Sequence, residues 1–255
     1  MPTFDPTAFV LVLARIAGLV GAAPVLGHLL IPIRVRIGIA VTLAAALAAV
    51  VPVPDAPPTT LAALVGAIAV EAAVGIVLGL VGQFVFAGVQ LGGQLAGIQM
   101  GFGMDALIEP QTNAQITVVA LWEQLLAFLV FLVLDVHHLL IRALLESFRV
   151  VPPGGAGVAA VGFRPVIALG GELFAIGVRI AAPVLVALLL TNTALGVLAR
   201  TIPQLNVFVV GFPVNVGVGL MILGASLPFT FRLLETRFGA LEPTLGALVR
   251  GLAHG

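Results

Sequence analysis

The chain has 255 residues, of which 61% are apolar and 9% charged, far below the charged fraction of about 25% that is usual in soluble proteins. All eleven basic residues are Arg and the formal net charge is zero, which argues against nucleic-acid binding, because that function needs clustered positive charge. The absence of Cys excludes disulfides, iron–sulfur clusters and thiolate metal sites. The composition predicts one polytopic membrane-type domain.

Long stretches without a charged side chain support this prediction. Residues 72–104, 180–199 and 201–231 each carry no charge, and spanning ~30 Å of hydrocarbon takes about 20 apolar residues. Residues 16–33 and 37–54 come close to that requirement. No basic residue precedes Arg15, so we expect no cleaved signal peptide.

Pro and polar clusters divide the chain into six expected helices. Their expected ranges are 7–30, 35–51, 61–100 with a Thr59 or Thr60 cap, 117–148, 166–200 and 211–238. The third is too long for one span, so it is either a helical hairpin or a helix that extends beyond the bilayer. With six spans, the Arg distribution favours both termini in the cytoplasm, whereas a hairpin would invert the second half.

Catalytic and metal sites are not expected. The chain has two serines and four histidines, no Cys or Tyr, and no G-x-S-x-G or H-E-x-x-H motif. His137 and His138 follow Asp135, but adjacent helical positions point about 100° apart, so both cannot easily face one ion. We interpret them as interfacial or helix-capping histidines. We also expect no cofactor, since no Gly-rich phosphate loop follows a strand.

Glycines recur at helical spacing within residues 61–101. The rows are Gly75 with Gly79, Gly88 with Gly92, and Gly93 with Gly97 and Gly101. Small residues at this spacing let apolar helices approach closely, although a chain with 30 glycines also produces such spacings by chance. Amides in the same stretch, Gln83, Gln90, Gln94 and Gln99, can line a wet path or bond across subunits.

Ionisable residues inside apolar stretches are a second class of candidate. They are Glu71, Glu123, Asp135, Glu172 and Arg179. Such residues are costly in hydrocarbon and face protein or water. A proton or ion relay is one interpretation, and inter-subunit salt bridges or helix-end positions are the interpretation we favour.

The most unusual local sequence is residues 99–111. It mixes flexible Gly with apolar side chains before Pro110, and those side chains are Met100, Phe102, Met104, Leu107 and Ile108. Irregular backbone at membrane depth is tolerated where it is buried in protein or lines a cavity, and Met adapts its shape readily. The segment is therefore either a pore-sealing loop or a buried connection between helices.

Residues 198–213, LARTIPQLNVFVVGFP, closely resemble the signature of the flagellar type III export-gate subunit R family (FliR) and its injectisome counterparts. The resemblance extends to Pro183 and to residues 24–36, 99–111, 139–148 and 192–200. The chain departs from the family pattern at Glu109, where Asp is expected, and at residues 135–138, where the family carries an Asn-Gly-His type of turn.

The resemblance implies an all-α fold of about six long kinked helices, arranged as hairpins in a helical cone with partner subunits. One copy of the chain would join several P-type and Q-type subunits, with a B-type switch subunit, in the cytoplasmic membrane at the flagellar basal body. The complex would conduct unfolded flagellar proteins. The single domain 1–255 would have a P-like part at 1–150, a Pro/Gly linker at 151–165 and a Q-like part at 166–238.

The resemblance also assigns roles to residues. It implies that the segment from Met100 to Gln111 is a plug loop in the closed pore. The signature turn and its subunit packing would use Arg200, Pro203, Gln204, Asn206, Phe208, Gly211, Phe212 and Pro213, with Arg200 anchoring the turn through buried contacts. The alternative is an ion-coupled small-molecule transporter whose coupling carboxylates are Glu71, Asp135 and Glu172. The two interruptions at 105–115 and 201–210 are dissimilar, which counts against this alternative.

Overall fold

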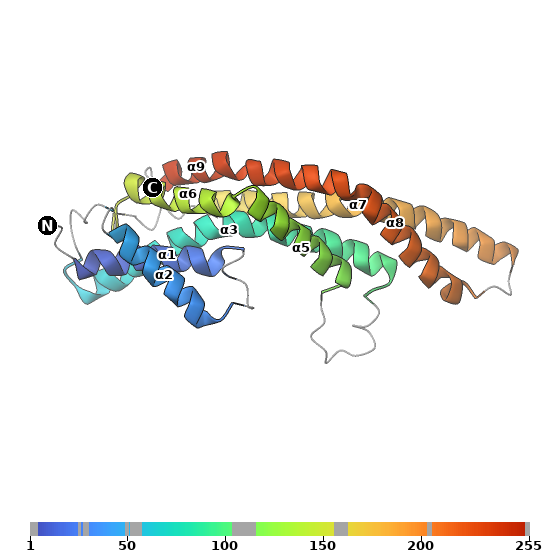
Figure 1. Ribbon diagram of the computed structural model, residues 1–255, viewed down its shortest axis with the longest axis horizontal. Helices are drawn as coiled ribbons and strands as arrows, with labels where there is room; N and C mark the ends of the chain where they lie inside the picture. Colours follow the sequence, from blue (N-terminus) through green and yellow to red (C-terminus); the bar gives the residue numbers. More distant parts are fainter. Residues whose placement is uncertain are drawn as a thin grey trace. The chain divides into compact units, whose positions relative to one another are not determined.

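The computed structural model describes residues 5–24, 27, 31–48, 51, 58–103, 116–155, 163–202 and 206–252 (Figure 1). Its helices are α1 (Pro6–Ala22), α2 (Ile33–Ala48), α3 (Leu61–Met100), α5 (Val118–Val133), α6 (Val136–Val150), α7 (Phe163–Thr201), α8 (Val207–Gly239) and α9 (Leu241–Leu252). No strand occurs in the described residues. Three helical segments are long and apolar enough to cross a membrane, or four if α5 and α6 form one broken span. The predicted all-α, membrane-type fold is confirmed.

The expected long helix at 61–100 is one unbroken helix of 40 residues, so the hairpin alternative is wrong. It begins after Thr60, whose Oγ1 accepts a hydrogen bond from the Ala63 N–H at 3.2 Å, as the capping prediction required. At its other end Gly101 has a φ of 103°, a left-handed conformation that Gly adopts readily. The N–H of Gly101 bonds the carbonyl of Ile98, and that of Phe102 bonds the carbonyl of Gly97. This Schellman motif ends the helix.

Three expectations about the remaining helices are wrong. The expected helix 7–30 ends at Ala22, because Ala23 has an extended backbone. The range 117–148 is not one helix, because Asp135 adopts a left-handed φ of 53° and separates α5 from α6. Helix α9 was not expected, because no uniformly apolar run marks it. It is amphipathic, and the buried residues that define its apolar face are Leu241, Leu245, Leu248, Val249 and Leu252.

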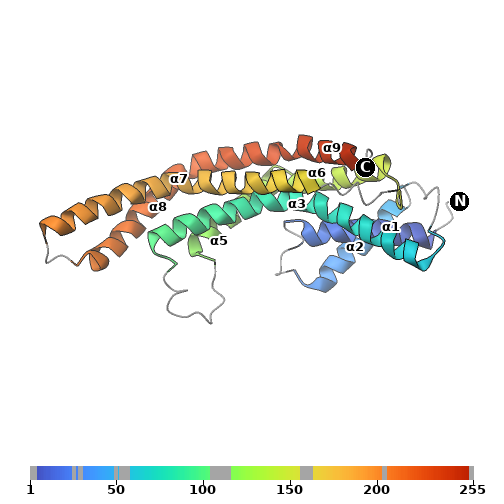
Figure 2. The same ribbon diagram turned by 180° about the vertical axis from the view of Figure 1, so that it is seen from behind.

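The chain forms two compact units. The first comprises Met1–Phe84, Leu134–Gly170 and Phe238–Gly255, and the second comprises Val85–Val133 and Gly171–Arg237. In the first unit α1 packs on α2, and α6 lies beside α9, as both views show (Figures 1 and 2). In the second unit a buried cluster joins α3, α5, α7 and α8. Its members are Ala96, Met100, Val119, Val184, Leu188 and Leu223.

Glycines position α1 against α3 in the first unit. A Cβ on Gly75 would overlap the carbonyl oxygen of Arg15, and one on Gly18 would overlap that of Ala72. A Cβ on Gly79 would lie 2.8 Å from both the carbonyl oxygen of Leu19 and the Cβ of Ala22. The two backbones therefore touch directly, and the predicted packing role of the Gly75–Gly79 row is confirmed.

The other two rows serve different partners in the second unit. Gly88 and Gly92 face α7, where a Cβ at either position would come within 2.9 Å of an Ile side chain, Ile176 or Ile180. Gly93 and Gly97 face the start of α5 at Ala120 and Thr117. The packing role is confirmed for both pairs. Gly101, the third member of the row that begins at Gly93, ends the helix.

Candidate functional site

The most extensive polar site in the described residues is a buried ion pair in the first unit. Arg15 of α1 and Glu71 of α3 have side chains 0% and 1% exposed, and the Nε of Arg15 lies 2.5 Å from Oε2 of Glu71. The guanidinium also donates to the Ser147 hydroxyl and to the carbonyl of Val151, each at 3.1 Å. Its Cζ lies 4.3 Å from the centroid of the Phe148 ring. Each of the three guanidinium nitrogens therefore donates a hydrogen bond, and an aromatic ring lies against the cation.

The second carboxylate oxygen of Glu71 also has a hydrogen-bond partner. Its Oε1 accepts a hydrogen bond from the Gly154 N–H at 2.8 Å, where Gly154 has a left-handed φ of 79°. The hydroxyl of Ser147 in turn donates to the Leu144 carbonyl at 2.7 Å. The network thus joins α1, α3, α6 and the turn after α6. It is a structural site, because all its polar atoms have partners within the chain.

Sequence reasoning found half of this network. Glu71 was singled out, but Arg15 was not, and the favoured partner was another subunit. The structure places the partner of Glu71 in the same chain. The signal that could have found it is Arg15 itself, since a cation inside an apolar helix needs an anion or a polar cavity.

The other ionisable candidates divide into two kinds. Glu123 in α5 is 4% exposed, and no described group bonds its Oε2. Asp135 and Glu172 have side chains 69% and 58% exposed in the single chain, so they are not buried there. Glu172 lies 3.9 Å from a guanidinium nitrogen of Arg237. Glu71 and Asp135 belong to the first unit and Glu172 to the second.

The segment predicted to seal a pore begins at a fixed anchor. Met100 is the last residue of α3, is 0% exposed and belongs to the buried cluster of the second unit, with Phe102 packed against it. Its side chain would collide with any Cβ on Gly219 of α8. Met104, Leu107 and Ile108 lie outside the described residues. Chain order therefore places the predicted plug residues directly after a packed helix end.

The chain that returns from this segment is also anchored. Thr117 caps α5 through its Oγ1, which accepts from the Ala120 N–H at 3.2 Å and donates to the Gly93 carbonyl at 3.3 Å. The amide oxygen of Gln94 accepts from the Thr117 N–H at 2.9 Å. Gln94 therefore makes a contact within the chain, which the spacing of the Gln residues did not predict.

The signature turn is described in part. Asn206 caps α8, because its Oδ1 and its carbonyl both accept from the Val209 N–H, at 3.4 Å and 3.1 Å. Arg200 is exposed, so the expectation that it anchors the turn through buried contacts is not met in the single chain. Pro203 and Gln204 lie outside the described residues, and of Phe208 only the helical backbone is described.

The end of the signature belongs to helix α8 and not to the turn. Gly211 is buried, Phe212 is 48% exposed, and Pro213 lies inside the helix. One turn of helix further along, the Nδ2 of Asn215 donates to Oδ1 of Asn192 on α7 at 2.9 Å. This amide pair fixes α8 against α7 within the second unit.

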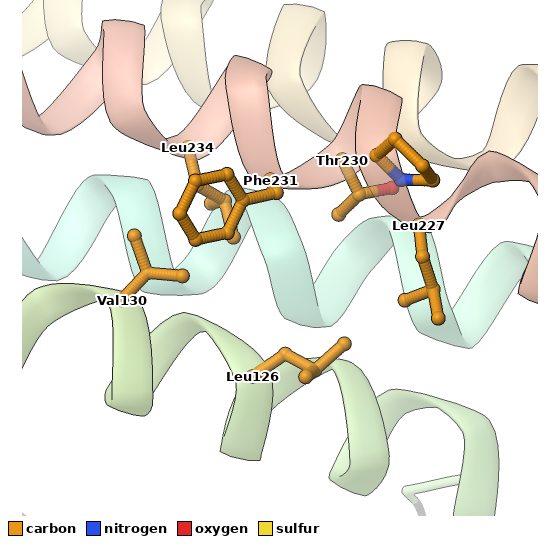
Figure 3. A pocket seen from close by; sticks show the side chains of 7 residues that line it. Leu126, Val130, Leu227, Thr230, Phe231 and Leu234 are labelled. Atoms are coloured by element: carbon orange, nitrogen blue, oxygen red, sulfur yellow. The ribbon is translucent and has the colours of Figure 1, made fainter.

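An apolar cavity of about 310 Å³ lies between α5 and α8 in the second unit (Figure 3). Leu126 and Val130 reach into it from α5, opposite Leu227 and Phe231 of α8. Pro228, Thr230 and Leu234 complete its lining. With no ionisable group in its lining and Thr230 as its one polar side chain, the cavity suits hydrocarbon and offers no acid or base.

Comparison with known proteins identifies the family. Residues 7–241 match the family model described as bacterial export proteins, family 1. The chain is 33% identical to the flagellar biosynthetic protein FliR of Escherichia coli K12, over 94% of this chain and 92% of that protein. The proteins of the same name from Pectobacterium carotovorum and Bacillus subtilis are 35% and 34% identical, with about 60% of each covered. The chain belongs to the FliR family of bacterial export proteins.

Proposed function

We propose that this chain is a structural, pore-forming subunit of the flagellar type III protein export gate. The observation that carries the proposal is the family match over residues 7–241, together with relatives named for flagellar biosynthesis. Such a subunit is a part of the export apparatus in the cytoplasmic membrane and has no catalytic role. The part of the chain that the structure describes contains no nucleophile paired with a base.

The apolar surface supports assembly with other subunits. The apolar stretch of each candidate span is mostly unburied within the chain. The buried share is 39% for α3, 33% for α7 and 17% for α8 with α9. Large side chains on α7 and α8 are among the most exposed, including Phe174, Leu189, Leu190 and Met221. In the proposed gate, P-type and Q-type subunits, a B-type switch subunit and lipid cover these faces. The P-like part at 1–150 and the Q-like part at 166–238 belong to the same proposal.

Native mass spectrometry tests the assembly. The chain is co-expressed with the P-type and Q-type subunits of its own gene neighbourhood, and the expected result is one copy of this chain in a large hetero-oligomer. A stable monomer or homodimer that binds neither neighbour would overturn the proposal. The transporter alternative would then return, although Glu71 would be a poor coupling carboxylate because its buried pairing with Arg15 holds it in place.

We further propose that the residues after Gly103 form a plug that blocks the pore of the closed gate. Support comes from the described chain on either side of these residues, which is anchored in the second unit by the Schellman motif at Gly101 and by the cap at Thr117. Deleting 104–108 removes Met104, Leu107 and Ile108 and spares Met100 and Phe102, which pack in the core. The assembled gate should then leak ions and small molecules.

Ion flux across vesicles that contain the purified gate measures the leak. Replacing residues 156–160 of the linker with a Gly/Ser segment of equal length is the control, and it should leave the gate tight. If the 104–108 deletion assembles normally and stays as tight as the control, the plug assignment is wrong.

A further inference from the structure

Three metal-ligating side chains gather at the start of α6, within the first unit. They are Asp135, His137 and His138, and their ligand atoms all lie within 4.8 Å of one another. Oδ1 of Asp135 is 3.9 Å from Nε2 of His137 and 3.3 Å from Nδ1 of His138. The two imidazole rings have centroids 4.1 Å apart and are tilted by 37°.

The three side chains converge although the two histidines are adjacent in one helix. The sequence argument against a metal site was that adjacent helical positions point about 100° apart. Both histidines do lie in α6, yet their ring centroids are only 4.1 Å apart. Asp135 precedes the helix with φ 53° and ψ 30°, and its side chain makes no capping hydrogen bond to α6. Its Oδ1 therefore remains available beside a ring nitrogen of each histidine, at 3.9 and 3.3 Å.

We propose that Asp135, His137 and His138 bind one divalent transition-metal ion of the Zn²⁺, Ni²⁺, Co²⁺ or Cu²⁺ class. Two imidazoles with one carboxylate suit these ions, whereas Mg²⁺ and Ca²⁺ prefer sites made of oxygen. Tetrahedral ligands at the usual zinc bond lengths are about 3.3–3.5 Å apart. The observed separations of 3.3 and 3.9 Å need only small side-chain rotations to reach this geometry.

The site is open at the surface of the single chain. The side chains of Asp135, His137 and His138 are 69%, 40% and 60% exposed, so an ion can enter without opening the fold. Three protein ligands leave at least one coordination position for water or for a group from another molecule. A bound ion would hold Asp135 in its left-handed conformation and so fix the residue that separates α5 from α6. This proposal does not depend on the proposed function.

Isothermal titration of the full chain in detergent, purified without a polyhistidine tag, tests the site with Zn²⁺ and Ni²⁺. The expected result is one ion per chain. H137A and H138A should each weaken binding at least ~10-fold, since each removes a direct ligand. D135N should also weaken binding while keeping a residue that tolerates the left-handed turn. Co²⁺ should give a visible d–d absorption spectrum in the wild-type chain that both His variants lose.

The two remaining histidines provide matched controls. H28A and H254A remove an imidazole elsewhere in the chain and should leave the affinity and the Co²⁺ spectrum unchanged. All variants should unfold at the wild-type temperature without metal, because the three ligands are exposed. The proposal is overturned if the wild-type chain binds no ion at millimolar metal, or if H137A and H138A bind as tightly as wild type.

Discussion

The first unit and the helices α7 and α8 of the second unit differ in how far the chain itself covers their side chains. In the first unit, a fully buried Arg15 and Glu71 find all their partners within the chain. Helices α7 and α8 instead leave large apolar side chains uncovered, such as Leu190 at 66% and Met221 at 73% exposure. The polar network around Arg15 is thus complete within the chain, whereas the apolar faces of α7 and α8 are left uncovered. The comparison indicates that mutations in these regions should act on different quantities, folding in the first and assembly in the second.

The largest expected effect is on the buried ion pair. E71A leaves Arg15 buried without its counter-charge, which should lower the free energy of unfolding by about 3–5 kcal/mol. Denaturant titration of the chain in detergent measures this loss. The double variant Arg15→Met with Glu71→Leu should recover much of it, because no uncompensated charge remains. E172A is the control, because that side chain is 58% exposed and pairs with Arg237 only at 3.9 Å, and it should cost at most about 1 kcal/mol. Equal losses of unfolding free energy for E71A and E172A would show that the buried ion pair stabilises the chain no more than the exposed one.

Two glycines of helix α3 should respond in opposite directions to the same substitution. G75A places a methyl group against the backbone oxygen of Arg15 and should destabilise the first unit by about 1–3 kcal/mol. G66A meets nothing within 4 Å on an exposed helix face and should stabilise by up to ~1 kcal/mol. Thermal unfolding of both variants separates the effects. A stabilising G75A would mean that α1 and α3 can separate at no cost.

The cap of α8 should have a smaller effect. N206A removes the Oδ1 acceptor at the start of the helix and should cost about 1 kcal/mol, with reduced secretion if the turn also positions the subunit. Ala159→Ser in the 151–165 linker is the control for secretion. If motility assays show equal tolerance at both positions, the signature turn has no structural role.

The smallest expected change in the free energy of unfolding is for a substitution on the exposed face of α7. This substitution best separates an effect on assembly from an effect on folding. Leu188 is 0% and its neighbour Leu189 is 62% exposed. L188A should cost about 2–5 kcal/mol in the isolated chain, whereas L189A should stay within about 0.5 kcal/mol. L189A should instead reduce the amount of chain recovered with P-type and Q-type subunits. Recovery equal to wild type would show that this face meets lipid and not a subunit.

Most of the fold class follows from the sequence. The bounds of the apolar 61–100 stretch, a cap at Thr59 or Thr60 and the packing role of the glycine rows were predicted, because they depend on local composition and spacing. Whether that stretch is one helix or a hairpin was left open. The break at Asp135 was not predicted, although the family pattern carries a turn at residues 135–138. Helix α9 was missed because its hydrophobicity lies on one face only.

The sequence by itself determined that this is an all-α membrane-type chain, because hydrocarbon thickness and helical periodicity act on residues close together in the chain. Its place in the FliR family rests on sequence similarity along residues 7–241. Only the tertiary structure decided which residues far apart in the sequence meet. It paired Arg15 with Glu71, gave each glycine row its own partner helix, and placed Asp135 beside His137 and His138. The physical reason is that a charge in a low-dielectric interior must find a partner, and that partner can lie at any distance along the sequence.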